Sequence, residues 1–282
     1  MTRTTIRDTL QAHLYRCESV ISFWEAGSTA LGRTDKYSDL DLGILYEPGT
    51  PRQVWMAVDQ ALGELGGVDL RWCEPPSVFR GEIGSSKRIF RLRGTEPWLL
   101  LDIRIFPASV TNLHDQRQRI GQIAIIFDRA GRLLKPSPWD EKANRERAGR
   151  ALHQHLMKWQ IYYGWFRKEL ARGSGLDAFM LFFHLAVVPL VTVLNIRYRL
   201  NRWDFGFRFL KNDWPAEIVK IVEDICYVPE PEMLEERFAA ADRLMQTTVG
   251  ELKEQGIVPI DPQGFDFSPG ISNANKDSFD WR

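Results

Sequence analysis

The chain has 282 residues, of which 44% are hydrophobic and 26% are charged, a composition typical of soluble globular proteins with one large domain or two ordinary ones. The 37 Lys and Arg residues equal the 37 Asp and Glu residues, so the formal net charge is zero. Proteins that grip a long phosphate backbone usually carry a basic excess, so this balance favours a small substrate and disfavours a nucleic-acid partner. The charged amino terminus lacks an apolar signal core, and the three scattered cysteines form no zinc pattern. We therefore expect a cytoplasmic protein with no membrane partner.

The first half of the chain alternates helical and strand patterns. Apolar residues at helical spacing predict helices over 6–19 and 51–65, the second with Pro51 at a first helical position. Residues 29–32 fit a short helical turn. Apolar or alternating segments predict strands over 20–25, 40–46, 68–74, 88–93, 98–106 and 123–127.

After Pro138 the pattern is helical, with helices expected over 141–172, 176–200, 203–211, 215–227 and 231–255. The apolar run 178–194 is about as long as the shortest membrane-spanning helix, but it contains His184 and Pro189, and we interpret it as a buried helix. Residues 256–282 are rich in Pro, Gly, Asn and Asp, yet they keep four aromatic residues: Phe265, Phe267, Phe279 and Trp281. Such a tail is expected to pack over a surface, and a homodimer in which it crosses to a second subunit is left open.

These patterns define an α+β fold in two domains. Residues 1–137 form a mixed β-sheet packed with helices, residues 138–255 form an all-helical, bundle-like domain, and residues 256–282 form a packed tail. Ligand clefts commonly lie between such domains, so a substrate cleft is expected there.

The segment from Phe23 to Tyr46 carries the chemistry. A strand runs into Gly27 and Ser28, and about a dozen residues later Asp39 and Asp41 begin another strand. Strand residues two apart point to the same face, so the two carboxylates project together. Paired carboxylates suit Mg²⁺, a hard cation that prefers oxygen ligands and can neutralise the phosphates of a nucleoside triphosphate.

The Gly-Ser corner and its loop fit the same chemistry. Gly27 lets the backbone approach a phosphate closely, and the Ser28 hydroxyl can donate a hydrogen bond to it. If a helix starts at Ser28 or Thr29, its first N–H groups also face the phosphates. Arg33 and Lys36 are candidates for neutralising phosphate oxygens, although loop cations are as often merely solvated.

A third carboxylate is expected from Asp102, an acid inside the otherwise apolar strand LLLDIRIF. It could complete the metal site or take the proton of an attacking hydroxyl as general base. The alternative is a structural salt bridge with Arg104 or Arg91. Asp69 and Glu96 are rivals for the third acid, but Asp69 lies near a strand start and Glu96 lies in a turn.

The string GSTALGRTDKYSDLDL with LLLDIRIF downstream resembles the nucleotidyltransferase superfamily of DNA polymerase β-like fold. In layout the chain looks most like the bacterial antibiotic nucleotidyltransferases, which adenylylate aminoglycosides or lincosamides and also have a helical second domain. The resemblance implies that Gly27 and Ser28 hold the triphosphate and that Asp39, Asp41 and Asp102 hold one or two Mg²⁺ ions. It also implies transfer of AMP from ATP to a hydroxyl group, with release of pyrophosphate.

Two functions follow from these residues. The first is an Mg²⁺-dependent adenylyltransferase acting on a hydroxyl of a small molecule, with an aminoglycoside or a lincosamide among the candidates. The second is a regulatory or antitoxin-like protein on the same fold that binds or modifies a protein or RNA partner. Three converging carboxylates favour the enzyme, because binding alone does not require them.

Overall fold

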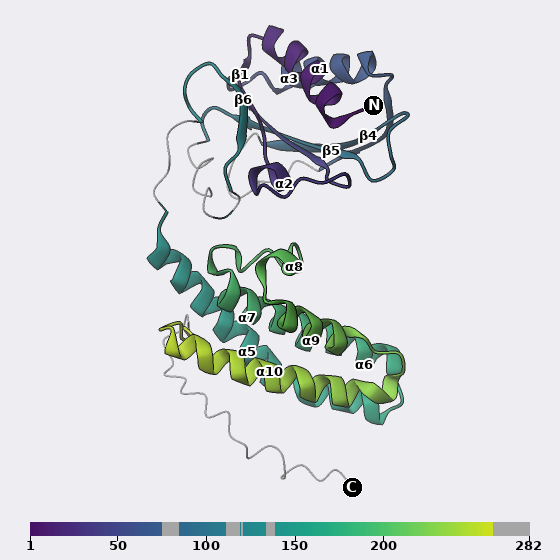
Figure 1. The fold of residues 1–282 in the computed structure, drawn as a ribbon, viewed down its shortest axis with the longest axis vertical. Coiled ribbons are helices and arrows are strands. Elements are labelled where there is room, and N and C mark those ends of the chain that lie inside the picture. Colours follow the sequence, from purple (N-terminus) through teal and green to yellow (C-terminus); the bar gives the residue numbers. More distant parts are fainter. Residues whose placement is uncertain (75–84, 111–118, 120, 134–138, 262–282) are drawn as a thin grey trace. The chain divides into compact units, whose positions relative to one another are not determined.

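The computed structural model describes residues 1–74, 85–110, 119, 121–133 and 139–261. Contacts within the chain divide it into two compact units, Met1–Trp139 and Asp140–Arg282 (Figure 1). The first unit holds a six-stranded sheet, and the elements described in the second are all helical. The expected α+β class, with a sheet domain followed by a helical part, is therefore confirmed.

The sheet is mixed, as expected. Its strands lie in the spatial order β3-β4-β5-β2-β1-β6. The neighbours β2 and β5 run parallel, whereas every other neighbouring pair is antiparallel. The strand bounds are β1 Val20–Glu25, β2 Leu40–Tyr46, β3 Val68–Cys73, β4 Ser86–Leu92, β5 Leu100–Pro107 and β6 Ala124–Asp128.

Two helices, α1 (Arg3–Arg16) and α3 (Pro51–Glu64), pack side by side on one face of this sheet (Figure 1). Alternation along β5 shows how the sheet divides its residues between faces. Leu101, Ile103 and Ile105 are fully buried in the core shared with α1 and α3, while Asp102 and Arg104 point to the opposite face and are half-buried. We call this opposite side the carboxylate face.

Among the described residues, the carboxylate face is covered over β1 and part of β2 and is less covered over β5, β4 and β3. A small apolar cluster built around Trp24, Leu45 and Leu133 covers the β1 end. The Trp24 indole lies directly over Gly43, where an added Cβ would approach it to 2.1 Å. Over β5, β4 and β3 the side chains of this face are half-buried or exposed.

The second unit is built from helices around one apolar core. Its helical segments are α5 Glu141–Ala171, α6 Gly175–Phe182, the π-helical segment Phe183–Val187, α7 Val188–Tyr198, α8 Leu210–Asp213, α9 Ala216–Cys226 and α10 Leu234–Glu254, with 3₁₀ turns at Leu200–Arg202 and Pro231–Met233. The helix expected over 176–200 is thus continuous but locally underwound, because a π segment precedes Pro189, which cannot donate to the preceding turn.

The apolar stretch Gly175–Tyr198 is long enough to cross a membrane by length and composition, with a mean hydropathy of 2.2. In this fold 56% of its most apolar window is buried. Its side chains Phe182, Leu190 and Leu194 belong to the core that α5 and α10 also form, which accounts for their apolar character.

The helix expected over 203–211 is wrong. Most of this segment is a chain of turns, and α8 begins only at Leu210. Gly206 and Phe209 have φ angles of 58° and 60°, in the left-handed region that ends helices. Buried polar contacts hold the turns instead, since the Asn195 amide donates to the carbonyls of Trp203 and Gly206 at 3.1 and 3.0 Å.

The start of the carboxy-terminal segment packs on α5. The Ile260 N–H donates to the Gly149 carbonyl at 3.0 Å, and Gly149 has no room for a Cβ beside Ile260. The four tail aromatics, Phe265, Phe267, Phe279 and Trp281, lie outside the described residues, so the packing expected of them stays a prediction.

Candidate functional site: a carboxylate row on the sheet

Gly27 is pressed against the carboxylate of Asp41. Its φ is +58°, and a Cβ built on it would lie 1.7 Å from Asp41 Oδ2. Only glycine satisfies both conditions, because other residues rarely adopt positive φ and all carry a Cβ. The Ala26 N–H donates to the Asp41 carbonyl at 2.8 Å. The structure therefore brings together the Gly-Ser corner and the Asp-x-Asp segment.

Asp102 lies next to Asp41 on the neighbouring parallel strand. The register of β2 and β5 pairs Asp41 directly with Asp102, and both side chains are half-buried on the carboxylate face. In-register residues of adjacent strands lie about 5 Å apart. Asp39 precedes β2, and its Oδ1 accepts a hydrogen bond from the Leu100 N–H of β5 at 3.2 Å. Two of the three predicted acids thus lie on the paired strands β2 and β5, and the third lies directly before β2.

Asp102 forms an ion pair with Lys87 of β4, not with Arg104 or Arg91 as the salt-bridge alternative supposed. Arg91 pairs with Asp69 instead. Sequence analysis did not identify Lys87, because no local pattern shows that β4 pairs with β5. Its ammonium group neutralises Asp102 in the structure.

Arg3 joins the two segments of the site, and sequence analysis missed it. One of its nitrogens donates to the carbonyls of Ser38 and Asp39. The other pairs with Glu25, a carboxylate only 5% exposed at the end of β1. The Thr29 hydroxyl also donates to Glu25 at 2.6 Å. A guanidinium has donors in a fixed fork, so Arg3 fixes the Gly-Ser corner relative to the start of β2.

The structure fixes the residues predicted to contact phosphate less closely than it fixes the three acids. The helix α2 begins at Gly27, one residue before the expected start, and spans only Gly27–Ala30. Ser28 follows Gly27 within it and is half-buried. Arg33 is half-buried in the loop that follows, and Lys36 is exposed, with its ammonium 4.8 Å from the Tyr37 ring centre. Lys36 is therefore the least fixed of the four.

Within the described part of the chain, no group of three or more His, Cys, Asp or Glu side chains is arranged to hold a metal ion. Asp102 is turned to Lys87, and Asp39 is turned to the Leu100 N–H. The oxygen chemistry of the three acids suits Mg²⁺, and the absence of a side chain on Gly27 makes room for the Asp41 carboxylate. The residue types suit Mg²⁺, and the three side chains would have to turn toward one another to bind it.

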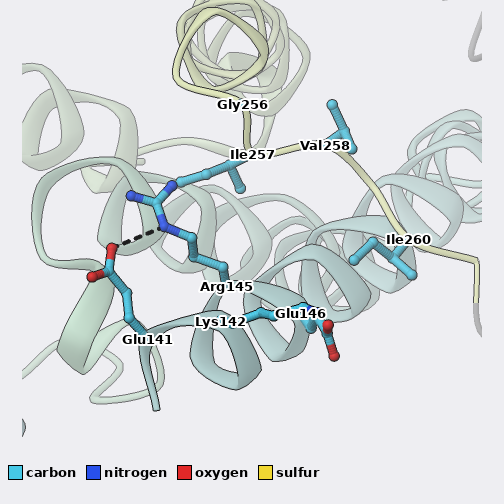
Figure 2. Close-up of a pocket in the computed structure, with 8 residues that line it drawn as sticks. All are labelled: Glu141, Lys142, Arg145, Glu146, Gly256, Ile257, Val258 and Ile260. Carbon is cyan, nitrogen blue, oxygen red and sulfur yellow. Dashed lines mark hydrogen bonds and ion pairs between the residues drawn. The ribbon is translucent and has the colours of Figure 1, made fainter. Parts of the chain in front are cut away.

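A separate pocket lies within the helical unit (Figure 2). It encloses about 410 Å³ between the first turns of α5 and the segment after α10. Glu141 and Arg145, one turn apart on α5, pair at 3.1 Å in its lining, and Ile257 and Ile260 give it an apolar wall. It carries none of the predicted site residues, and its described acids and bases are balanced.

No known family profile matches the sequence, and no curated protein is significantly similar to it. Solved structures do resemble the chain. An aminoglycoside 6-adenyltransferase from Bacillus subtilis matches 93% of this chain and 94% of its own at 11% identity, with a TM-score of 0.36. A nucleotidyltransferase-like protein from Exiguobacterium sibiricum covers 88% and 76% at 12% identity, with a TM-score of 0.37.

The spectinomycin adenyltransferase AAD(9) of Enterococcus faecialis, solved with ATP and spectinomycin, covers 89% of this chain and 96% of its own at 10% identity, with a TM-score of 0.32. Identities and TM-scores at this level carry no residue roles to this chain. Any such role depends on the chain's own geometry.

Proposed function

We propose that the chain is an Mg²⁺-dependent nucleotidyltransferase that moves AMP from ATP to a hydroxyl of a small molecule, such as an aminoglycoside or lincosamide antibiotic. The observation that carries this proposal is the row Gly27, Asp41, Asp102. A glycine without room for a side chain, a carboxylate beside it and an in-register second carboxylate lie on a partly open sheet face.

In this proposal Asp39, Asp41 and Asp102 would hold Mg²⁺, which when bound neutralises phosphate charge. Gly27 and Ser28 bind the β- and γ-phosphates, with Ser28 donating its hydroxyl and Arg33 and Lys36 adding positive charge. Asp102 takes the proton of the attacking hydroxyl as general base. The acceptor oxygen bonds to the α-phosphorus, the bond from that phosphorus to the bridging oxygen of the β-phosphate breaks, and pyrophosphate leaves.

Lys87 has a defined part in this scheme. Its ion pair with Asp102 holds that carboxylate on the carboxylate face while the site contains no substrate. When phosphate arrives, the ammonium group can exchange the carboxylate for a phosphate oxygen, since both are anionic partners at the same place. We expect this exchange to release Asp102 for proton transfer.

The test is pyrophosphate release from ATP and Mg²⁺ over a panel of hydroxyl acceptors: kanamycin, spectinomycin, lincomycin and a neutral aryl disaccharide. We expect release with at least one acceptor, and a loss of about a thousandfold in Asp41→Asn. Asp59→Asn is the matched control, because Asp59 is an exposed acid of α3 that pairs with Arg71 on the opposite face.

Equal rates in the wild type and Asp41→Asn would contradict the proposal. Tight binding of ATP and Mg²⁺ with no release for any acceptor would instead favour the regulatory alternative, in which a protein or RNA is the partner. Calorimetric titration of the same variants with ATP and Mg²⁺ distinguishes these two results. A cytoplasmic location, where ATP and Mg²⁺ are abundant, accords with the proposal.

A further inference from the structure

The carboxylate face continues past Asp102 to an exposed aromatic side chain. Trp72 of β3 is 50% exposed, and its strand neighbour Leu70 is 57% exposed. Large apolar side chains that stay open on a sheet face next to reactive groups are candidates for ligand contact. Neither residue takes part in the scheme above.

The side of the sheet that Trp72 faces follows from its neighbours. Arg71 points to the helical side, where its guanidinium pairs with Asp59 of α3 and lies 5.2 Å from the Phe90 ring centre. Successive strand residues point to opposite faces, so Trp72 points to the carboxylate face. The Lys87–Asp102 ion pair places β4 and β5 side chains on that same face.

Register places Trp72 in line with the reactive groups. Trp72 pairs with Ile89, Ile89 pairs with Asp102, and Asp102 pairs with Asp41. Gly27 adjoins Asp41 on the other side. One cross-strand row therefore runs from the Gly-Ser corner through both acids to Trp72, and at strand spacing Trp72 lies about 10 Å beyond Asp102.

The geometry of the proposed reaction indicates which substrate lies at the Trp72 end of this row. In-line displacement puts the leaving and attacking oxygens on opposite sides of the α-phosphorus. If the leaving pyrophosphate lies at Gly27 and Ser28, the attacking hydroxyl comes from the Asp102 side. We propose that Trp72 and Leu70 form the platform on which the acceptor rests, which deepens the proposed function and rests on it.

The platform also limits the chemistry of the acceptor. An indole face suits the apolar face of a sugar or an aromatic ring, and the span of about 10 Å from Asp102 calls for an acceptor of more than one ring. The platform therefore favours a glycoside of more than one ring with an apolar face for the indole.

The experiment measures steady-state kinetics of pyrophosphate release for the wild type, Trp72→Ala and Trp72→Phe with each acceptor of the panel. We expect Trp72→Ala to raise the KM of the acceptor about tenfold, the effect of losing one aromatic stacking contact. The KM of ATP should change less than about twofold, because ATP lies at the other end of the row. Trp72→Phe should restore most of the acceptor affinity, since it keeps a ring.

Arg71→Ala is the matched control, because Arg71 is the adjacent residue of the same strand and faces the helices. Its acceptor KM should equal that of the wild type, and unfolding curves check that all variants fold. An unchanged acceptor KM in Trp72→Ala, with ATP turnover intact, would overturn the platform and leave the proposed function standing.

A wild type that binds no ATP with Mg²⁺ would overturn the proposed function and the platform together. Calorimetric titration with ATP and Mg²⁺ alone detects that result before any acceptor is added. A raised KM for ATP in Trp72→Ala, with the acceptor KM unchanged, would assign the indole to the nucleobase and contradict the platform.

Discussion

Two sets of charged side chains, one in each unit, differ in how far they are enclosed. In the helical unit, Arg199 and Asp213 are 1% and 4% exposed and pair at 3.0 Å, and Arg202 adds a second bond to the same acid at 2.8 Å. In the sheet unit, the carboxylates of Asp41 and Asp102 are half-buried on a face that is partly open. One set is enclosed, and the other meets solvent.

This difference indicates which charged side chains a ligand can reach. A buried ion pair keeps its partners, because exposing either charge alone costs several kcal/mol. The buried pair of Arg199 and Asp213 stabilises the turns between α7 and α9, where Arg199 also donates to the carbonyls of Gly206 and Arg208. The Asp102 and Lys87 side chains are 25% and 19% exposed, so separating them costs less than separating the enclosed pair. The comparison therefore assigns structure to the first set and chemistry to the second.

The strongest way to test this contrast is Asp213→Ala, which leaves two buried guanidinium groups against one another. We expect the free energy of unfolding of the helical unit to fall by about 3–5 kcal/mol. Denaturant unfolding followed by circular dichroism measures it. Asp224→Ala is the control, because Asp224 pairs with Lys220 on the exposed surface of α9, and it should cost less than about 0.5 kcal/mol. Equal losses would contradict the assignment.

The next effect is expected from Gly27→Ala, which forces a Cβ into the space of the Asp41 carboxylate. Pyrophosphate release should fall about a hundredfold, or about 2.7 kcal/mol of transition-state stabilisation. Gly32→Ala is a close control, since Gly32 also has a positive φ, of +65°, but has nothing within 4 Å of an added Cβ. It should show only the backbone strain, about 1 kcal/mol in unfolding, with activity retained. Similar activities for the two variants would show that contact with Asp41 is irrelevant.

Much of the sheet could be predicted from the sequence, because alternation marks a strand locally. The strands β1 and β2 begin and end at the predicted residues, and the spacing of Asp39, Asp41 and Gly27 is visible along a single short segment. The turns over 203–209 were missed, because apolar residues there imitate helical spacing while Gly206 and Phe209 adopt positive φ.

Pairings across the fold could not be predicted. Lys87 with Asp102, and Trp72 in the same row, depend on the order β3-β4-β5-β2, which no local pattern reveals. In the sequence, Glu25 is the polar last residue of an apolar strand, and no neighbouring residue indicates that Arg3 is its partner. Burial creates that requirement, since an enclosed carboxylate needs a donor. The signal that could have found it is an acid at the end of a buried strand.

The smallest of the three effects concerns Arg3, which sharpens the comparison because it is a partly enclosed charge inside the reactive unit. Its ion pair with Glu25 is 21% and 7% exposed at the two side chains, between the extremes discussed above. Arg3→Ala should therefore lower pyrophosphate release about tenfold, roughly 1.4 kcal/mol, by loosening the Gly-Ser corner from the start of β2. The loss should appear in kcat more than in the acceptor KM, because Arg3 holds the reacting segments and does not contact the acceptor platform. Arg7→Ala, one turn along α1 with an exposed pair to Asp8, should leave both constants unchanged. If the free energy of unfolding falls while kcat is unaltered, Arg3 is a purely structural residue. The contrast between enclosed and open charges would then also hold within the sheet unit.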